Sequence, residues 1–344
     1  MGHHFDRFIN PHQVGGIQQY VIDNGEGRGV RVCEVNTGSG LRYRVVVDRG
    51  LDIDHAFMRE HSIAFLTHKG VTPPTRAMDR GADWLKSFAG GLVTSCGPFN
   101  TGAPATDEGK DWPLHGEHSN TAAQIESVIQ PDPHAGRLEM SITGLVRYGA
   151  FYGPNLTLRR TIRSTLGSPK IEIDDTFIND GNSDLQHAWL LHINFGYPLL
   201  DAGTEFVFDA KSHTPRSDEM SQAYFTNLED GMKFPAPSRE QQGDGHVFRY
   251  LDAVPNAGRV RAGLWNPKLK FGVAIDYAKK DFPRLGQWLH WGQREYVCAL
   301  EPMTAGVEGR DKDRARGWLR PIKAGASIRY RYSIEVVTNR SQIL

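Results

Sequence analysis

The chain has 344 residues and carries 40 basic and 40 acidic side chains, so its formal net charge is zero. This balance excludes the basic surface of a nucleic-acid-binding protein, and we expect no nucleic-acid partner. No apolar run approaches the roughly 18 residues that a membrane span needs, so we expect no membrane partner either.

The predicted elements are short segments rich in Val, Ile, Thr, Tyr and Phe, separated by Gly, Asn, Asp or Pro. In chain order they are residues 29–35, 41–47, 122–129, 137–145, 155–164, 170–178, 186–194, 260–265, 271–277, 295–301 and 327–336. Apolar and polar side chains alternate most clearly in 170–178 and 328–336, as in half-buried antiparallel strands. Helical periodicity is limited to residues 83–88. The pattern predicts an all-β, antiparallel protein.

The chain shows neither a low-complexity linker nor a fixed-period repeat, so the strands are expected to form one domain. We expect an N-terminal extension over residues 1–14, the β-domain over 15–337 and a C-terminal tail over 338–344. Residues 69–110 and 201–245 are rich in turn formers and predict long loops, where binding residues tend to lie.

The three cysteines are far apart in the sequence and have no Cys-x-x-Cys spacing. An odd, scattered set argues against a disulfide framework or structural zinc, and favours a reducing compartment. The N-terminus also lacks the apolar segment of a secretory signal. We therefore expect a cytoplasmic protein.

Two histidines occupy positions from which they can act on a ligand. His115 lies in a turn-rich segment before Gly116, and the alternative for it is a structural, hydrogen-bonded role. His192 interrupts an apolar strand, and a buried histidine must be hydrogen-bonded or functional. Asn194 falls on the same face as His192 if that strand alternates.

A carboxylate and an arginine end two other predicted strands. Glu301 closes an apolar strand before Pro302, a common position for a general base, although a Glu can also simply surface there. Arg49 follows a Val-rich strand and is suited to bidentate hydrogen bonds, while neighbouring acidic residues offer it an ordinary salt bridge. Trp288 belongs to an aromatic run that either stacks on a ligand ring or packs internally. Arg80 lies in the loop-rich stretch and provides local positive charge.

In this order, the motifs resemble the aldose-1-epimerase superfamily and, more closely, its DUF4432 branch. The resemblance rests on residues 48–53, 88–97, 114–116, 192–200 and 300–302, and it spans residues 15 to 337. It implies a galactose-mutarotase-like antiparallel β-supersandwich. It further implies a mutarotase that interconverts sugar anomers without a cofactor or metal, with a small-molecule carbohydrate as partner and a monomeric or homodimeric state.

The resemblance also implies residue roles. Glu301 matches the general base and His192 the general acid, while His115 matches the histidine that holds the sugar near its ring oxygen and C1. Arg49 is the expected substrate-binding arginine, and we expect Asn194, Trp288 and Arg80 to contribute to binding.

Two alternatives remain open at this point. One is a metal-assisted isomerase or lyase on the same fold, for which His115, His118, His192 and Glu301 offer ligands. The other is a carbohydrate-binding protein without catalysis.

Overall fold

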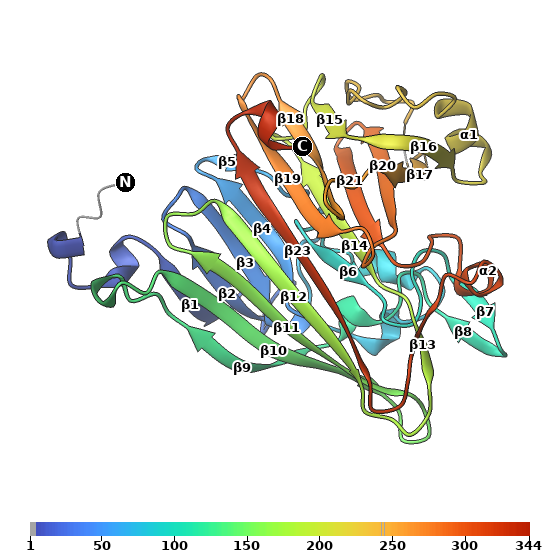
Figure 1. Cartoon of the computed structure of the whole chain (residues 1–344), viewed down its shortest axis with the longest axis horizontal. Coiled ribbons are helices and arrows are strands. Elements are labelled where there is room, and N and C mark those ends of the chain that lie inside the picture. Colours follow the sequence, from blue (N-terminus) through green and yellow to red (C-terminus); the bar gives the residue numbers. More distant parts are fainter. Residues whose placement is uncertain (1–4, 242, 244) are drawn as a thin grey trace.

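The computed structural model describes residues 5–241, 243 and 245–344, so the first four residues of the expected N-terminal extension lie outside the described residues. Three antiparallel sheets of five, six and eight strands dominate the fold. Figure 1 shows the eight-stranded sheet as a broad twisted surface, with the two smaller sheets behind it. The prediction of an all-β, antiparallel protein is therefore confirmed.

The eight-stranded sheet contains most of the strands that the sequence predicts. In sheet order it consists of β15 (Glu205–Phe208), β18 (Arg259–Asn266), β19 (Phe271–Ala278), β23 (Ser327–Val337), β12 (Lys170–Asn179), β11 (Asn155–Thr165), β10 (Glu139–Gly149) and β9 (Ala123–Ile129). On β12, Ile171 and Ile173 are buried whereas Glu172 is exposed. The period-2 pattern therefore gives this sheet one inner and one outer face.

The six-stranded sheet carries the polar residues of interest. Its order is β16 (Ala210–Pro215), β17 (Val247–Ala253), β20 (Arg284–Gly292), β21 (Glu295–Met303), β14 (Leu190–Gly196) and β6 (Thr94–Cys96). The prediction of a single strand over residues 186–194 is wrong, because the chain forms two strands there, β13 (Leu185–His187) and β14. Between them, Trp189 donates its backbone N–H to the Thr304 hydroxyl, and β13 pairs with β22 (Arg320–Ile322).

The five-stranded sheet is formed by the first part of the chain. It runs through β1 (Gly16–Val21), β2 (Arg31–Asn36), β3 (Leu41–Val46), β4 (Asp52–Met58) and β5 (His61–Ser62). Between it and β9, the chain forms loops, β6 and the hairpin of β7 (Ala105–Asp107) and β8 (Lys110–Trp112). The loop-rich character predicted for residues 69–110 is confirmed.

Helices are few and short. The helical signal at residues 83–88 corresponds to a 3-10 helix, η5 (Asp83–Lys86). Two α-helices that the sequence pattern did not reveal, α1 (Glu219–Tyr224) and α2 (Arg310–Ala315), have 6 residues each. No helix in the described part of the chain has the length and apolar character needed to cross a bilayer.

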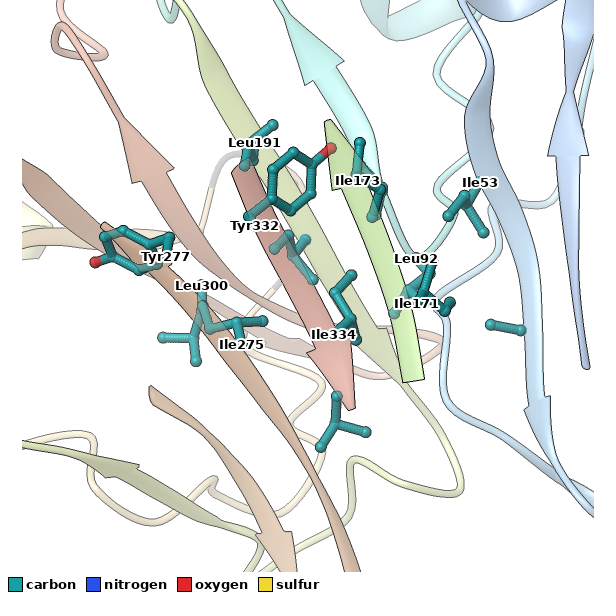
Figure 2. Packing of buried hydrophobic residues seen from close by; sticks show 14 of the residues in the cluster. Ile53, Leu92, Ile171, Ile173, Leu191, Ile275, Tyr277, Leu300, Tyr332 and Ile334 are labelled. Atoms are coloured by element: carbon teal, nitrogen blue, oxygen red, sulfur yellow. The ribbon is translucent and has the colours of Figure 1, made fainter. Parts of the chain in front are cut away.

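The main core lies between the sheets. Figure 2 shows side chains of the large sheet packed in one layer with those of the smaller sheets: Ile171, Ile173, Ile275, Tyr277, Tyr332 and Ile334 with Leu191, Leu300, Ile53 and Leu92. All of these side chains are buried. Burial of apolar surface on this scale is the main force that holds the three sheets together.

A buried charged network connects the same sheets. Arg160 on β11 is 1% exposed and donates to both carboxylate oxygens of Asp175 on β12, at 2.7 and 2.9 Å. It also donates to Asp52 on β4 at 2.8 Å and to the Ser95 hydroxyl on β6 at 2.9 Å. One guanidinium therefore joins all three sheets.

The C-terminal segment, expected to be a tail, packs onto the domain. Residues after β23 form η8 (Arg340–Gln342), which Asn339 and Gln342 close with a capping box. Ile343 is fully buried beside Val207 and Ala274. Residues 338–344 thus contribute to a small apolar cluster of the fold.

Candidate active site

Glu301 and His192 face each other across two adjacent antiparallel strands. β14 and β21 pair Leu190 with Met303 and Ile193 with Leu300, which brings His192 opposite Glu301. The Nε2 atom of His192 lies 3.3 Å from Oε1 of Glu301. Two residues separated by more than a hundred positions in sequence thus form one side-chain pair.

Strand alternation explains why this pair lies outside the main core. The side chains of Leu191 and Ile193 belong to the large core between the sheets, as does that of Leu300. The intervening His192 and the following Glu301 therefore point to the opposite face of the six-stranded sheet. Both remain buried, at 7% and 2% exposure, because loops cover this face.

Burial controls the protonation of the pair. Desolvation raises the pKa of Glu301 to about 8, and the positive charge of Arg216 opposes this rise. Desolvation also lowers the pKa of His192 to about 4, against a contact with Asn194 that raises it. A carboxyl and an imidazole that are both driven toward their neutral forms hold one proton between them at neutral pH.

His115 approaches the pair from a loop. It has a φ of 56°, and its Nδ1 accepts a hydrogen bond from the backbone N–H of Gly102 at 3.3 Å. Its ring centroid lies 5.6 Å from that of His192. Desolvation lowers the pKa of His115 well below its usual value, with further contributions from His192 and His246. A neutral His115 with its Nδ1 engaged can present Nε2–H as a donor.

Aromatic rings enclose the two histidines. Trp84 of η5 stacks on Phe88 with a centroid separation of 4.6 Å, and it lies at the same distance from His115. Phe88 and Trp288 flank His192 at 6.0 and 5.3 Å. Trp288 is half-buried, so part of its ring stays available to a ligand. The structure therefore brings Trp288, a predicted binding residue, next to the pair of His192 and Glu301.

Arg216 and His246 also belong to the site, although the sequence did not reveal them. The guanidinium of Arg216 donates to Nε2 of His246 at 3.0 Å and to Asp218 at 2.6 Å. His246 in turn lies 5.9 Å from Trp288 between ring centroids. Arg216 comes from the turn-rich stretch 201–245 and His246 directly follows it. No strand pattern or motif there distinguishes one polar residue from its neighbours.

Asn194 and Arg49 are buried and engaged with the backbone. Asn194 donates from its amide to the carbonyl oxygens of Gly91 and His192, both at 3.0 Å, and so supports the strand next to the pair. Arg49 ends η3 (Val47–Arg49) and donates to the Thr72 carbonyl at 3.1 Å and the Ser87 carbonyl at 2.9 Å. Arg49 thereby ties the loop that carries Trp84 and Phe88 to the five-stranded sheet.

Arg80 and His118 are not brought to the Glu301 pair. Arg80 is exposed at the start of the turn that leads into η5. His118 of η6 (His118–Asn120) is fully buried, with Nδ1 at 2.5 Å from the Tyr148 hydroxyl and Nε2 at 3.3 Å from Asp52. Within the described residues, no three His, Cys, Asp or Glu side chains are grouped so as to hold a metal ion.

Comparisons with known proteins agree with this architecture. Residues 27–336 match the family described as a domain of unknown function, DUF4432. No curated protein matches the chain in sequence. A Klebsiella pneumoniae structure named "putative aldose 1-epimerase" superposes with a TM-score of 0.85 at 22% identity, covering 97% of this chain and 88% of that one.

Two further structures share the fold at lower identity. A galactose mutarotase-like protein from Clostridium acetobutylicum gives a TM-score of 0.64 at 10% identity, over 93% of this chain and 98% of that one. The galactose 1-epimerase of Lactobacillus acidophilus gives 0.58 at 9% identity, over 94% and 99%. At these identities the likeness establishes the galactose-mutarotase-like fold and confirms the predicted fold class.

Proposed function

We propose that this chain, which belongs to the DUF4432 family, is a cofactor-independent carbohydrate epimerase that interconverts the anomers of a sugar by general acid–base catalysis. The observation that carries the proposal is the pair of Glu301 and His192, 3.3 Å apart and nearly closed off from solvent. The names of the structural neighbours, which include a galactose 1-epimerase, point to the same reaction.

Anomer exchange requires two coupled proton transfers. In ring opening, the Glu301 carboxylate removes the proton of the anomeric hydroxyl while the His192 imidazolium protonates the ring oxygen. The bond between C1 and the ring oxygen breaks, and C1 becomes a carbonyl carbon. The carbonyl group then turns about the C1–C2 bond. As the ring closes, the protonated Glu301 gives its proton to the carbonyl oxygen, and neutral His192 takes the proton of the hydroxyl group that attacks C1.

The pair keeps one proton throughout this cycle, and the pKa shifts place that proton on Glu301 at rest. Ring opening as described therefore begins after the proton has moved from Glu301 to His192. Ring opening converts a carboxylate and an imidazolium into a carboxylic acid and a neutral imidazole, so the pair holds one proton before and after each step. With the pKa of Glu301 raised to about 8 and that of His192 lowered to about 4, one proton per pair is the state expected at neutral pH. Both arrangements of that proton are used in turn.

The surrounding residues have distinct supporting roles in this proposal. His115 holds the sugar near C1 and the ring oxygen by donating from Nε2. Arg216 favours the ionised form of Glu301 and so makes the carboxylate available as a base. Trp288 packs against an apolar face of the sugar ring, as aromatic side chains commonly do with flat apolar surfaces.

Exchange NMR on purified protein tests the function. Saturation transfer between the two anomeric protons is measured on a panel of free aldoses and ketoses, with wild-type protein and with Glu301→Gln. We expect accelerated exchange for at least one sugar and its loss in the variant. Binding of a sugar without faster exchange would instead indicate a carbohydrate-binding protein, and the proposed reaction would then be rejected.

A further inference from the structure

A cleft opens on the face of the six-stranded sheet that carries Glu301. β20 and β21 pair Gly286 with Glu301 and Arg284 with Met303. Arg284 lies two residues from Gly286, so it projects from the same face, about 7 Å further along the strand. That offset is comparable to the length of a hexose.

The cleft has the dimensions of a ligand site. Its volume is about 480 Å³, and its lining includes Arg284, Trp318, Tyr250, Ser217 and Glu308. This volume falls within the range of about 300–1,000 Å³ that is typical of small-molecule pockets. We call it the Arg284 cleft.

The Arg284 cleft adjoins the proposed catalytic centre at two places. Ser217 directly follows Arg216, the residue whose charge acts on Glu301, and its hydroxyl donates to Glu308 at 2.6 Å. Below them, Phe248 and Met303 form a buried apolar floor, against which both Trp288 and Tyr250 pack. Tyr250 also lines the cleft, so the cleft and the surroundings of His192 share one apolar cluster.

Arg284 is a fixed cation without an ion-paired carboxylate among the described residues. Its guanidinium lies 3.5 Å from the centroid of the Trp318 ring, and it donates to the Thr304 carbonyl at 2.9 Å. Asp313 acts on Arg284 through space, but its Oδ1 accepts from the Gly306 N–H. Desolvation lowers the pKa of Arg284 to about 10. A partly desolvated guanidinium with unused donors is suited to a bidentate anion.

Arg316, on the same Trp318 ring, provides the contrast. Its guanidinium lies 4.8 Å from the ring centroid, and it pairs with Glu308 at 2.7 Å. The charge of Arg316 is therefore already matched within the protein, whereas that of Arg284 is not. This difference identifies Arg284 as the residue that an incoming anion would contact.

We propose that the Arg284 cleft binds an anionic group of the sugar, a carboxylate or a phosphate, while the anomeric carbon lies at Glu301. The inference rests on the proposed function and deepens it, because it assigns the substrate class as acidic or phosphorylated sugars. Contact with the Trp318 ring fixes the guanidinium, and the Arg284 donors that are not bonded to Thr304 meet the two oxygens of the anion.

Calorimetric titration tests the proposal independently of turnover. The probes are glucose and galactose, their 6-phosphates, glucuronate, galacturonate and inorganic phosphate alone. We expect wild-type protein to bind at least one of the anionic sugars more tightly than its neutral counterpart. Arg284→Gln should reduce this preference, measured as the ratio of the two dissociation constants, about 10- to 100-fold, the usual effect of losing a charged hydrogen-bonding partner.

Two further variants keep the result interpretable. Arg147→Gln removes an exposed arginine on β10 of the large sheet and should leave the preference unchanged. Arg284→Lys keeps the charge without the bidentate geometry and should give an intermediate ratio. It also carries the test if Arg284→Gln does not fold.

Each contrary result is distinct. Equal binding of neutral and anionic sugars, no binding of any sugar, or a preference that survives in Arg284→Gln would overturn the proposal. Inorganic phosphate that binds as tightly as the sugar phosphates would reduce the cleft to a site for free anions and would also overturn it. Anion-dependent sugar binding without anomer exchange would leave the cleft intact and reject only the proposed reaction.

Discussion

The imidazole Nε2 of His192 lies 3.3 Å from the carboxylate Oε1 of Glu301, and neither residue is more than 7% exposed. This distance allows the two groups to act on neighbouring oxygens of one ligand. It also makes their protonation states interdependent, and several measurable consequences follow from that dependence.

Replacing Glu301 by Gln should reduce the rate of anomer exchange by about 10²–10⁴-fold, because a side-chain amide cannot accept a proton as a general base. The measurement is saturation-transfer NMR on the best sugar of the panel. Glu295→Gln is the matched control, since Glu295 begins the same strand but is exposed. A folded Glu301→Gln protein that retains the wild-type rate would show that the pair is not the catalytic centre.

Replacing Arg216 by Gln should move the pH dependence of the reaction toward higher pH. The charge of Arg216 lowers the pKa of Glu301, so its loss should raise the pH at which the carboxylate forms. The pH–rate profile of kcat/KM measures this shift, and Arg216→Lys should restore part of it. A loss of rate that is uniform over pH would argue that Arg216 only supports the local structure.

The sequence singles out His192 and Glu301, which the structure pairs, better than the residues around them. His192 and Glu301 stand out because each is a polar residue in a predicted apolar strand. Such a residue can be recognised from the sequence alone. Arg216 and His246 lie among many polar residues, so only the fold distinguishes them. The strand-end position of Arg49 suggested a ligand contact, which stays a prediction. In the structure its guanidinium donates to the carbonyls of Thr72 and Ser87, partners that the sequence pattern did not indicate.

Strand prediction failed where backbone partners come from distant segments. The apolar run at residues 186–194 reads as one strand, but the N–H of Ala188 donates to Pro98 and that of Trp189 to Thr304. Such long-range partners leave no trace in local periodicity. The short helices α1 and α2 were missed for a related reason, since six residues carry too few turns to show a helical pattern.

The buried carboxyl of Glu301 should make the protein less stable as the pH rises. Its pKa is raised from 4.5 to about 8 in the folded chain, so the unfolded chain loses this proton first. Stability should therefore fall between about pH 5 and pH 8, by up to about 1 kcal/mol per pH unit from this group. Urea unfolding of wild-type protein and Glu301→Gln at several pH values measures it. Parallel curves for the two proteins would contradict the assignment.

Replacing Arg160 by Ala should destabilise the fold by about 3–5 kcal/mol, because Asp175 and Asp52 would lose their common partner inside the protein. The neighbouring Arg159 is the matched control. It points outward and pairs with Glu126 at 2.6 Å on the surface, so Arg159→Ala should cost at most about 1 kcal/mol. Similar losses of unfolding free energy in the two variants would show that the buried network contributes little.

The position of His192 and Glu301 on paired strands has a consequence for how this protein can be redesigned. The spacing of His192 and Glu301 is set by the hydrogen-bonded register of β14 and β21. Arg216, Ser217 and Trp318, by contrast, come from connecting segments. Under the proposed function, exchange of those segments should alter which sugar is accepted without displacing His192 and Glu301. This separation offers a practical route to redesigned substrate preference by grafting loops onto an unchanged sheet.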